Sequence, residues 1–400
     1  MRRLLAQLTC TALLSTTGCL THRSHQWDRG TSPSPSPAPA PSVVIVGEAG
    51  APGRTPAQVA RGVAETLEAE RAAGRAPVVV WLGDLLIDAR GKLDCSAAAA
   101  PWDRAGVDAL SEVVRSHVRD GGSAYALPGE AAYRCGAREA LRTDTRRPAA
   151  QPGTHFVVDV LPSSATRVAA TCSGGACSAL AQAEDARLQL VFVDLTPWIA
   201  GSRPPATDED LLSLEALMRT LRDAPGPPRV LVSNYPVEAV GFHGNGGGDP
   251  DSSVHTLAPP VTEALEAGVF VGALAGHDRA TYACDDISDG TIRSNRVFLP
   301  HRVFQVVSGA ASDPDVYNSW RRLRFNSSIA LLPTRYTPRA GFAVVHFGEQ
   351  PHATLHAYWG GRWQTSSVAL SLAPDPRPAL VRVPSTAPCL RCPVVPYNER

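Results

Sequence analysis

Five polar side chains in this sequence each follow a short apolar run and lie close to a glycine or a proline. They are Glu48, Asp84, Glu130, Asn234 and His277. Carboxylate, amide and imidazole groups are the side chains with which proteins bind divalent cations. Because oxygen donors outnumber the single imidazole, the set favours a hard cation such as Mg²⁺, Mn²⁺ or Ca²⁺ over iron or zinc. The pattern therefore indicates a cation-binding site built from distant segments.

The first three apolar runs have the length and composition of buried strands. Val43–Val46, Val78–Leu82 and Ala124–Leu127 are rich in β-branched and small apolar residues. Apolar residues recur at helical spacing in the two segments between them, Thr55–Ala73 and Asp103–Val118. Alternating strands and helices predict a parallel sheet covered by helices, and ligands of such sheets gather beyond the carboxyl ends of the strands.

The second half of the chain continues this alternation. One helix is predicted over Asp208–Leu221. Further strands are predicted over Phe156–Leu161, Leu188–Asp194, Val230–Ser233, Val269–Ala275, Phe304–Ser308, Gly341–Phe347 and Ala353–Trp359. The last two are typical of an antiparallel hairpin. Spacing alone thus predicts an α/β fold with mixed sheets.

The order and the residues of these blocks resemble the motifs of the calcineurin-like metallophosphoesterases, and within them those of the purple acid phosphatase branch. The blocks that carry the resemblance are Gly47-Glu48-Ala49-Gly50, Gly83-Asp84, Gly129-Glu130, Asn234-Tyr235-Pro236 and Gly276-His277-Asp278-Arg279. The resemblance implies a four-layer α/β/β/α sandwich of two mixed β-sheets flanked by helices. It also implies a pair of metal ions that clamp a phosphate and activate a water molecule.

The resemblance implies seven metal-ligand positions. At several of these positions the sequence has a different residue type from the family. Only Asp84 and His277 are the family's own residue types. Other oxygen donors stand at three positions: Glu48, Glu130 and Asn234. The last two positions have lost their ligands, because Ile87 replaces a tyrosine and Arg279 replaces the final histidine. Ala131 likewise replaces the histidine that follows the third block's ligand in the family.

Charge limits how many cations this site can hold. A guanidinium group stays protonated in proteins and cannot ligate a metal. The carboxylates of Glu48, Asp84 and Glu130 together with Arg279 give a formal charge of three negatives and one positive, or about −2. That charge suits one divalent ion and not two. The sequence therefore predicts a one-metal or metal-free site, and a two-metal iron or zinc centre is not expected.

Two functions follow from this site. The first is a surface pseudophosphatase, with weakened or lost two-metal activity, that binds a phosphorylated ligand or a protein partner. The alternative is an active phosphomonoesterase with a remodelled one-metal site. In that case the resemblance implies that His243, nine residues beyond Asn234, contacts the substrate, where it would act as general acid.

The N-terminus is predicted to direct export. Residues 1–19 have two arginines, an apolar run too short to span a membrane, and small residues before Cys19, which resembles a bacterial lipobox. We expect a cell-envelope lipoprotein anchored to the membrane at Cys19, on the periplasmic or the outer face, with plain secretion as the alternative. Residues 20–42 form a Ser/Pro/Ala-rich spacer, residues 43–365 the metallophosphoesterase-like domain, and residues 366–400 a Pro-rich tail with a CxxC sequence.

The balance of charged residues bears on whether the protein binds nucleic acids. The chain has 38 basic and 38 acidic residues and no basic face of the kind that nucleic acids require, so nucleic-acid binding is not expected.

Disulfides are favoured in an exported protein. Cys172 and Cys177 are close enough to close a tight hairpin, and Cys95 and Cys135 lie in loops after neighbouring strands. The pairing of Cys284, Cys389 and Cys392 stays open.

Overall fold

The structure is a computed structural model. It describes residues 40–49, 54–83, 85–87, 93–103, 107–144, 146–162, 165–198, 207–237, 239, 258–287, 299, 301–309, 311, 334–337 and 339–372. The predicted export signal, most of the spacer and the CxxC sequence of the tail lie outside these residues. Among the helices of the described ranges, none combines the length and the apolar character needed to cross a bilayer.

Six strands form the first sheet, in the order β15-β14-β13-β1-β2-β3. The parallel strands are β1 (Ser42–Gly47), β2 (Val78–Leu82) and β3 (Ser123–Leu127). Antiparallel to them run β13 (Gly341–His346), β14 (His352–Trp359) and β15 (Arg362–Ala369). The predicted closing hairpin is β13–β14, and β15 continues the sheet beyond the predicted domain end at residue 365.

Nine strands form the second sheet, in the order β12-β10-β11-β9-β8-β7-β4-β5-β6. Its parallel centre consists of β7 (Leu188–Val193), β8 (Arg229–Ser233), β9 (Gly272–Ala275) and β11 (Phe304–Ser308). The flanking strands are β4 (His155–Val160), β5 (Thr166–Ser173), β6 (Ala176–Cys177), β10 (Thr281–Cys284) and β12 (Arg335–Thr337).

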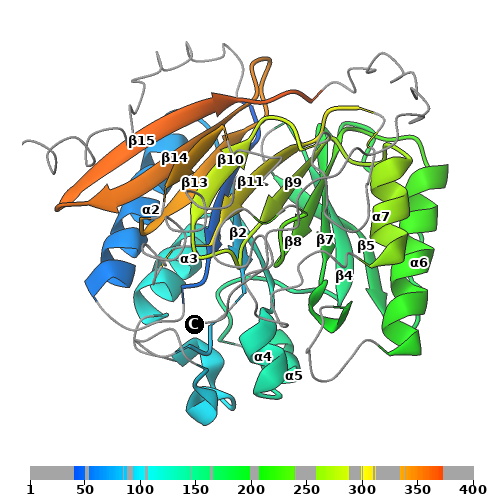
Figure 1. Cartoon of the computed structure of the whole chain (residues 1–400), viewed down its shortest axis with the longest axis horizontal. Helices are drawn as coiled ribbons and strands as arrows, with labels where there is room; N and C mark the ends of the chain where they lie inside the picture. The colour runs from blue at the N-terminus through cyan, green and yellow to red at the C-terminus, as the bar shows by residue number, and fades with distance from the viewer. Residues whose placement is uncertain are drawn as a thin grey trace, which may run out of the picture.

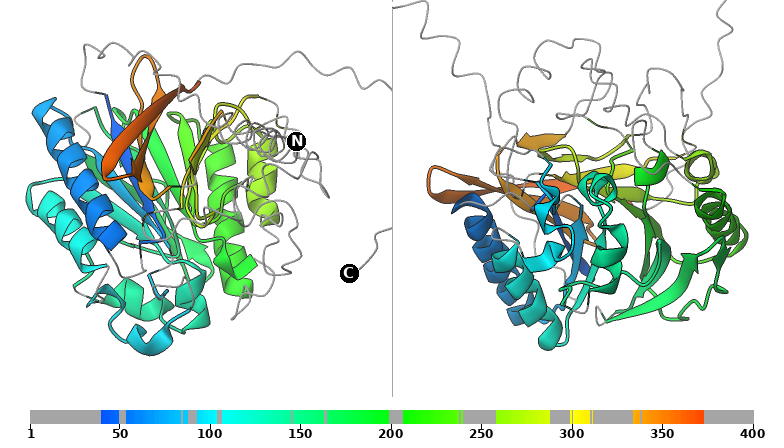
Figure 2. Two further views of the ribbon diagram at one scale, coloured as in Figure 1. Left: turned by 60° about the vertical axis from the view of Figure 1, so that its left-hand side comes forward. Right: turned by 90° about the horizontal axis from the view of Figure 1, so that it is seen from below.

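Two helices cover the outer face of each sheet (Figures 1 and 2). The first sheet carries α2 (Arg54–Ala72) and α3 (Asp108–Arg119), and the second carries α6 (Asp208–Asp223) and α7 (Pro259–Glu266). The predicted start of the second helix at Asp103 was wrong. A short 3₁₀ turn, Pro101–Asp103, ends there, and α3 begins at Asp108.

Alternation along the strands explains the layers. Val43 and Ile45 of β1 join the core between the two sheets, whereas Val44 and Val46 join the core beneath α2 and α3. A third core packs α6 and α7 against the second sheet, with Leu217 and Val261 among its members. Each sheet therefore buries both faces, and the predicted four-layer α/β/β/α sandwich is confirmed.

Two short helices and two disulfides complete the part of the fold that matters for the site. Helix α4 (Glu130–Arg134) begins directly after β3, and α5 (Arg138–Thr143) follows it. Cys135 at the end of α4 is bonded to Cys95 of the 3₁₀ turn Cys95–Ala97. Cys172 and Cys177 are bonded across the β5–β6 hairpin. Both disulfides agree with the pairs favoured by the sequence.

Candidate functional site

The carboxyl ends of four strands meet where the two sheets approach each other. The Glu48 N–H after β1 donates to the Leu82 carbonyl at the end of β2, at 3.2 Å. On the second sheet, the Gly276 N–H after β9 donates to the Asn234 carbonyl after β8, at 3.1 Å. Three of the predicted site residues, Glu48, Asn234 and His277, are thus placed on one edge. We call this the metal-ligand edge.

Glycines let the two sheets touch at this edge. A Cβ on Gly47 would lie 2.1 Å from the Ser308 carbonyl oxygen, and one on Gly83 would lie 2.0 Å from the Asn234 Oδ1. Each pair joins one sheet to the other. Gly47 is therefore required by the close approach of the Ser308 backbone, and Gly83, which has a positive φ, also leaves room for the Asn234 side chain.

Backbone strain is concentrated at the metal-ligand edge. Among the described residues, the non-glycine residues with positive φ are Glu48 (51°), His277 (64°) and Arg279 (45°). All three come from the sequence blocks that predicted the site. Left-handed backbone at non-glycine residues is costly and gathers at functional sites, where the surrounding structure imposes it.

Each described carboxylate of the predicted ligand set faces an arginine. Arg279 Nε lies 4.0 Å from Glu48 Oε2, with the Glu48 side chain buried and Arg279 22 % exposed. Glu130 forms an ion pair with Arg134, one turn along α4. The formal charges of these four groups cancel. Arg134 was missed by the sequence analysis, although its spacing of four residues from Glu130 is the helical ion-pair spacing.

Two of the positions that lost a polar residue now pack together. Ile87 and Ala131 belong to one small apolar cluster with Leu86 and Ala137. Ile87 is 7 % exposed and Ala131 4 %. Apolar side chains therefore pack together at two positions where the resemblance implies polar ones.

The second-sheet side keeps buried polar groups. Asn234 is fully buried, and among the described residues neither its Oδ1 nor its Nδ2 has a hydrogen-bond partner. The buried His277 ring lies against Tyr235, with ring centroids 4.1 Å apart. Asp278, also buried, accepts a hydrogen bond from the Tyr282 hydroxyl at 2.8 Å.

The described donors are not grouped as ligands of a metal ion. Within the described ranges, no group of three or more histidine, cysteine, aspartate or glutamate side chains is arranged to hold a metal ion. Glu48 and Glu130 face arginines, and Arg279 brings a positive charge to the edge. Two predicted site residues, Asp84 and His243, lie outside the described residues.

Comparisons with known proteins bear on the fold. No family model matches the sequence, and no curated protein matches it. A solved structure titled GAP50, the anchor in the inner membrane complex of Plasmodium, matches with a TM-score of 0.53 and 13 % identity, over 82 % of this chain and 89 % of that one. A purple acid phosphatase from yellow lupin matches at 0.47 and 10 % identity, over 85 % and 55 %. A 5'-nucleotidase from Candida albicans matches at 0.39 and 8 % identity, over 84 % and 52 %.

The chain has a metallophosphoesterase-like fold. At these identities the likeness concerns the fold alone. In this metallophosphoesterase-like chain, the metal-ligand edge lies at the carboxyl ends of the strands, where the sequence blocks predicted a site.

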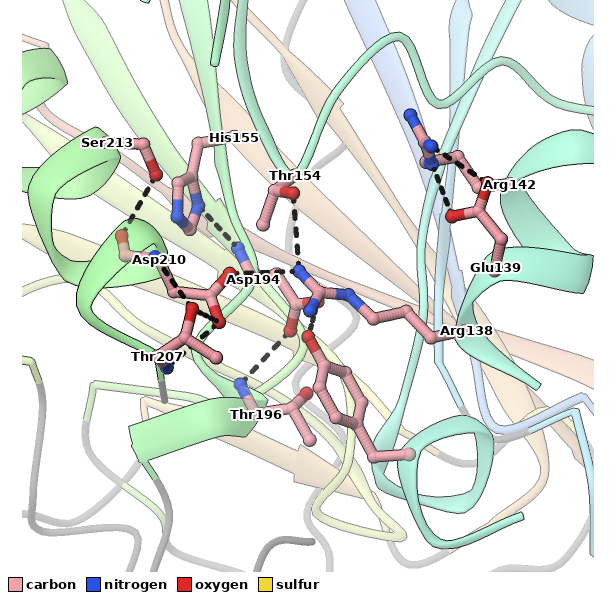
Figure 3. A network of polar contacts seen from close by, with 11 residues as sticks. Arg138, Glu139, Arg142, Thr154, His155, Asp194, Thr196, Thr207, Asp210 and Ser213 are labelled. Carbon is pink, nitrogen blue, oxygen red and sulfur yellow. Dashed lines mark hydrogen bonds and ion pairs between the residues drawn. The ribbon is translucent and has the colours of Figure 1, made fainter. Parts of the chain in front are cut away.

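A second polar cluster lies one strand away, and the sequence analysis missed it. Asp194 follows β7, and the register pairs Val193 of β7 with Ser233 of β8, so that Asp194 is the neighbour of Asn234. The Tyr133 hydroxyl of α4 donates to Asp194 Oδ2 at 2.6 Å. The Thr196 N–H donates to Asp194 Oδ1 at 3.1 Å (Figure 3).

Arg138 extends this cluster from α5 to α6. Its Nη2 donates to Thr154 Oγ1 at 3.2 Å and to Asp210 Oδ1 at 3.3 Å (Figure 3). Its guanidinium also lies over the Tyr133 ring, 4.9 Å from the centroid. Asp210 is held in turn by the capping box that it forms with Thr207 at the start of α6. The T-x-x-D spacing was the one sequence signal for this cluster.

Burial shifts the protonation of this second cluster. It raises the pKa of the Asp194 carboxyl, which is fully buried, and it also raises the pKa of Tyr133. It lowers the pKa of His155, whose Nδ1 accepts from the Asp194 N–H, to about 4. His155 is therefore neutral at pH 7, because a charged imidazole would lose its hydration.

Proposed function

We propose that the protein is a pseudophosphatase: a metallophosphoesterase-like chain with weakened or lost two-metal activity that binds a phosphorylated ligand or a protein partner at the metal-ligand edge. One observation carries the proposal. Ile87 and Ala131, at two positions where the family has polar site residues, are packed against each other in an apolar cluster.

The charges of the edge support the same proposal. A second metal would need a further ligand at position 279, where a guanidinium group stands 4.0 Å from Glu48. Bringing a divalent ion beside that group costs electrostatic free energy, and two tightly bound ions are disfavoured most. A partly exposed arginine and a buried amide instead suit an anionic or polar ligand.

The cellular setting is part of the proposal. We propose an exported lipoprotein held to the membrane through Cys19, with secretion as the alternative. The two disulfides support an oxidising compartment. The similar fold of GAP50, which is described as an anchor in a membrane complex, supports a role of this fold in attachment.

Metal content and turnover, measured together on the purified full chain, test the proposal. The protein is incubated with Mg²⁺, Mn²⁺, Ca²⁺, Zn²⁺ or Fe²⁺ and assayed on a generic phosphomonoester. We expect less than one ion per chain and no turnover. About one bound ion with turnover that Asp84→Ala abolishes would instead establish a remodelled one-metal hydrolase, and His243→Ala would then test the general acid.

A further inference from the structure

Metal ions with ligands on both sheets would join the two sheets at their carboxyl ends. The ligand positions of the resemblance are distributed in this way, with Glu48 and Glu130 after strands of the first sheet and His277 after a strand of the second. Among the described residues, which do not include Asp84, the donors are not grouped to hold a metal ion, and other contacts join the sheets close to this edge. Those contacts can be identified in the structure.

The second polar cluster crosses from one sheet to the other. Tyr133 and Arg138 belong to α4 and α5, which follow β3 of the first sheet. Their partners Asp194, Asp210 and Thr154 belong to segments that follow or precede strands of the second sheet. Each hydrogen bond therefore links the two halves of the sandwich.

The Tyr133–Asp194 bond of the link is buried, and the acidic partners Asp194 and Asp210 are each held by further hydrogen bonds on the second-sheet side. Asp194 is fully buried and Tyr133 is 3 % exposed. The Thr196 N–H holds the second oxygen of Asp194, and the Thr207 capping box holds Asp210. A charge-assisted hydrogen bond is shorter and stronger than a neutral one, and low dielectric strengthens it further.

We infer that Tyr133, Arg138, Asp194 and Asp210 form a clamp that joins the carboxyl ends of the two sheets in place of metal ions. The clamp positions α4 and α5, and with them Glu130, beside the metal-ligand edge. We call this segment, Glu130–Thr143, the α4 wall. It holds this wall in the metal-free protein. The inference does not depend on the proposed binding function, because it concerns only what holds the edge together.

Amide hydrogen exchange on the full chain tests the clamp with a matched pair of tyrosine variants. Tyr133→Phe removes the bond to Asp194 between the sheets, and Tyr282→Phe removes a bond of 2.8 Å to Asp278 within the second sheet. We expect Tyr133→Phe to speed exchange about tenfold in residues 130–143 and at the start of α6. Tyr282→Phe should leave both segments unchanged. Equal exchange in the two variants at these segments would overturn the inference.

A second pair keeps the test decisive where Tyr133→Phe does not fold. Arg138→Met removes the contacts of α5 with Asp210 and Thr154, whereas Arg142→Met removes an ion pair with Glu139 on α5 itself (Figure 3). Arg138 and Arg142 are both partly exposed, at 29 % and 38 % of the side chain. Faster exchange at the start of α6 in Arg138→Met alone is expected, and no difference between the variants would contradict the clamp.

A chelator separates the clamp from a metal link. Treatment of the wild-type chain with EDTA should leave exchange in residues 130–143 unchanged, because the clamp contains no metal. Faster exchange after chelation, restored by adding Mn²⁺ or Zn²⁺, would show that a metal joins the sheets and would overturn the inference. Phosphatase turnover is a separate measurement that tests the proposed function. The clamp and the proposed function can therefore fail independently of each other.

Discussion

The metal-ligand edge and the clamp meet at two adjacent strand ends of the second sheet, where Asn234 follows β8 and Asp194 follows β7, yet they are built in opposite ways. At the edge, Asn234 is buried with no hydrogen-bond partner in the described part of the chain, and Ile87 packs among apolar residues. At the clamp, Asp194 is equally buried and both of its oxygens accept hydrogen bonds. The edge thus resembles a site that has lost its partner, whereas the clamp satisfies its own groups. The comparison separates contacts that join the two sheets through satisfied polar groups from buried polar groups that do not join them.

The largest expected effect comes from crowding the metal-ligand edge. Gly47→Ala would place a Cβ 2.1 Å from the Ser308 carbonyl oxygen and close to two further backbone atoms. Because backbone cannot rotate away as a side chain can, we expect a loss of about 3 kcal/mol or more in the free energy of unfolding, measured by urea denaturation.

A milder variant on the same edge serves as the control for Gly47→Ala. A Cβ on Gly276 would meet the Leu82 Cβ at 3.0 Å and the Leu82 oxygen at 3.2 Å. Gly276→Ala should therefore cost about 1 kcal/mol. Equal losses in the two variants would show that close approach at Gly47 is not what the sheets require.

The next effect concerns the clamp and depends on pH. The pKa of His155 falls from its ordinary value to about 4 in the folded chain, so the unfolded chain binds one more proton between pH 6.5 and pH 4. Folding stability from this group is complete above pH 6.5 and is lost as the pH falls, by about 3 kcal/mol at pH 4. Asp194 acts in the opposite sense, because burial raises its pKa.

Denaturation at a series of pH values isolates the contribution of His155. The slope of unfolding free energy against pH should fall by about one proton in His155→Gln relative to the wild type. His346 and His356, whose pKa values burial also lowers to about 4, stay in both proteins and contribute equally. The same slope in both proteins would contradict the assignment.

A smaller effect is expected when the edge loses its positive charge. Arg279→Met leaves the buried Glu48 carboxylate without this neighbour, which should destabilise the chain by about 1–2 kcal/mol. Arg119→Met, which breaks an exposed ion pair with Glu112, should have no measurable effect on the melting temperature. If Arg279→Met were more stable than the wild type, Arg279 would be strained and would not compensate the charge of the Glu48 carboxylate.

The smallest effect is expected at Asn234, and it separates the two regions most directly. Asn234→Ala should change the free energy of unfolding by less than about 1 kcal/mol, because no hydrogen bond is lost and an unpaired amide is removed. Tyr133→Phe, which breaks a buried bond to a carboxylate, should cost about 1–3 kcal/mol. Similar losses of unfolding free energy in Asn234→Ala and Tyr133→Phe would contradict the distinction between the metal-ligand edge and the clamp.

The predictable part of the fold follows from its buried strands. Val43–Val46 and Val78–Leu82 are apolar on both faces, because each sheet is covered on both sides. The end of β1 places Glu48 at the edge, and the ends of β8 and β9 place Asn234 and His277 there. The strand β5 and the edge strand β15 escaped prediction because their exposed faces are polar and leave no continuous apolar run.

The clamp could not be predicted from the sequence, and the reason is physical. Tyr133 and Asp194 are separated by 61 residues, and Arg138 and Asp210 by 72. The packing of α4 and α5 against the second-sheet half of the sandwich brings them together, and no local pattern in the sequence indicates this pairing. The pairing of Glu130 with Arg134 is different, because four-residue spacing on a helix is a local signal that the sequence contains.

The Cys95–Cys135 disulfide bears on where this protein can be made. The bond closes a loop with a separation of 40 residues that includes α3 and β3, and it ends α4 beside Tyr133. By restricting the unfolded chain, such a bond contributes about 3–4 kcal/mol. A chain produced in a reducing cytosol would lack it and would begin with the α4 wall loosely held. Oxidative folding during production is therefore a condition for judging any of the variants above.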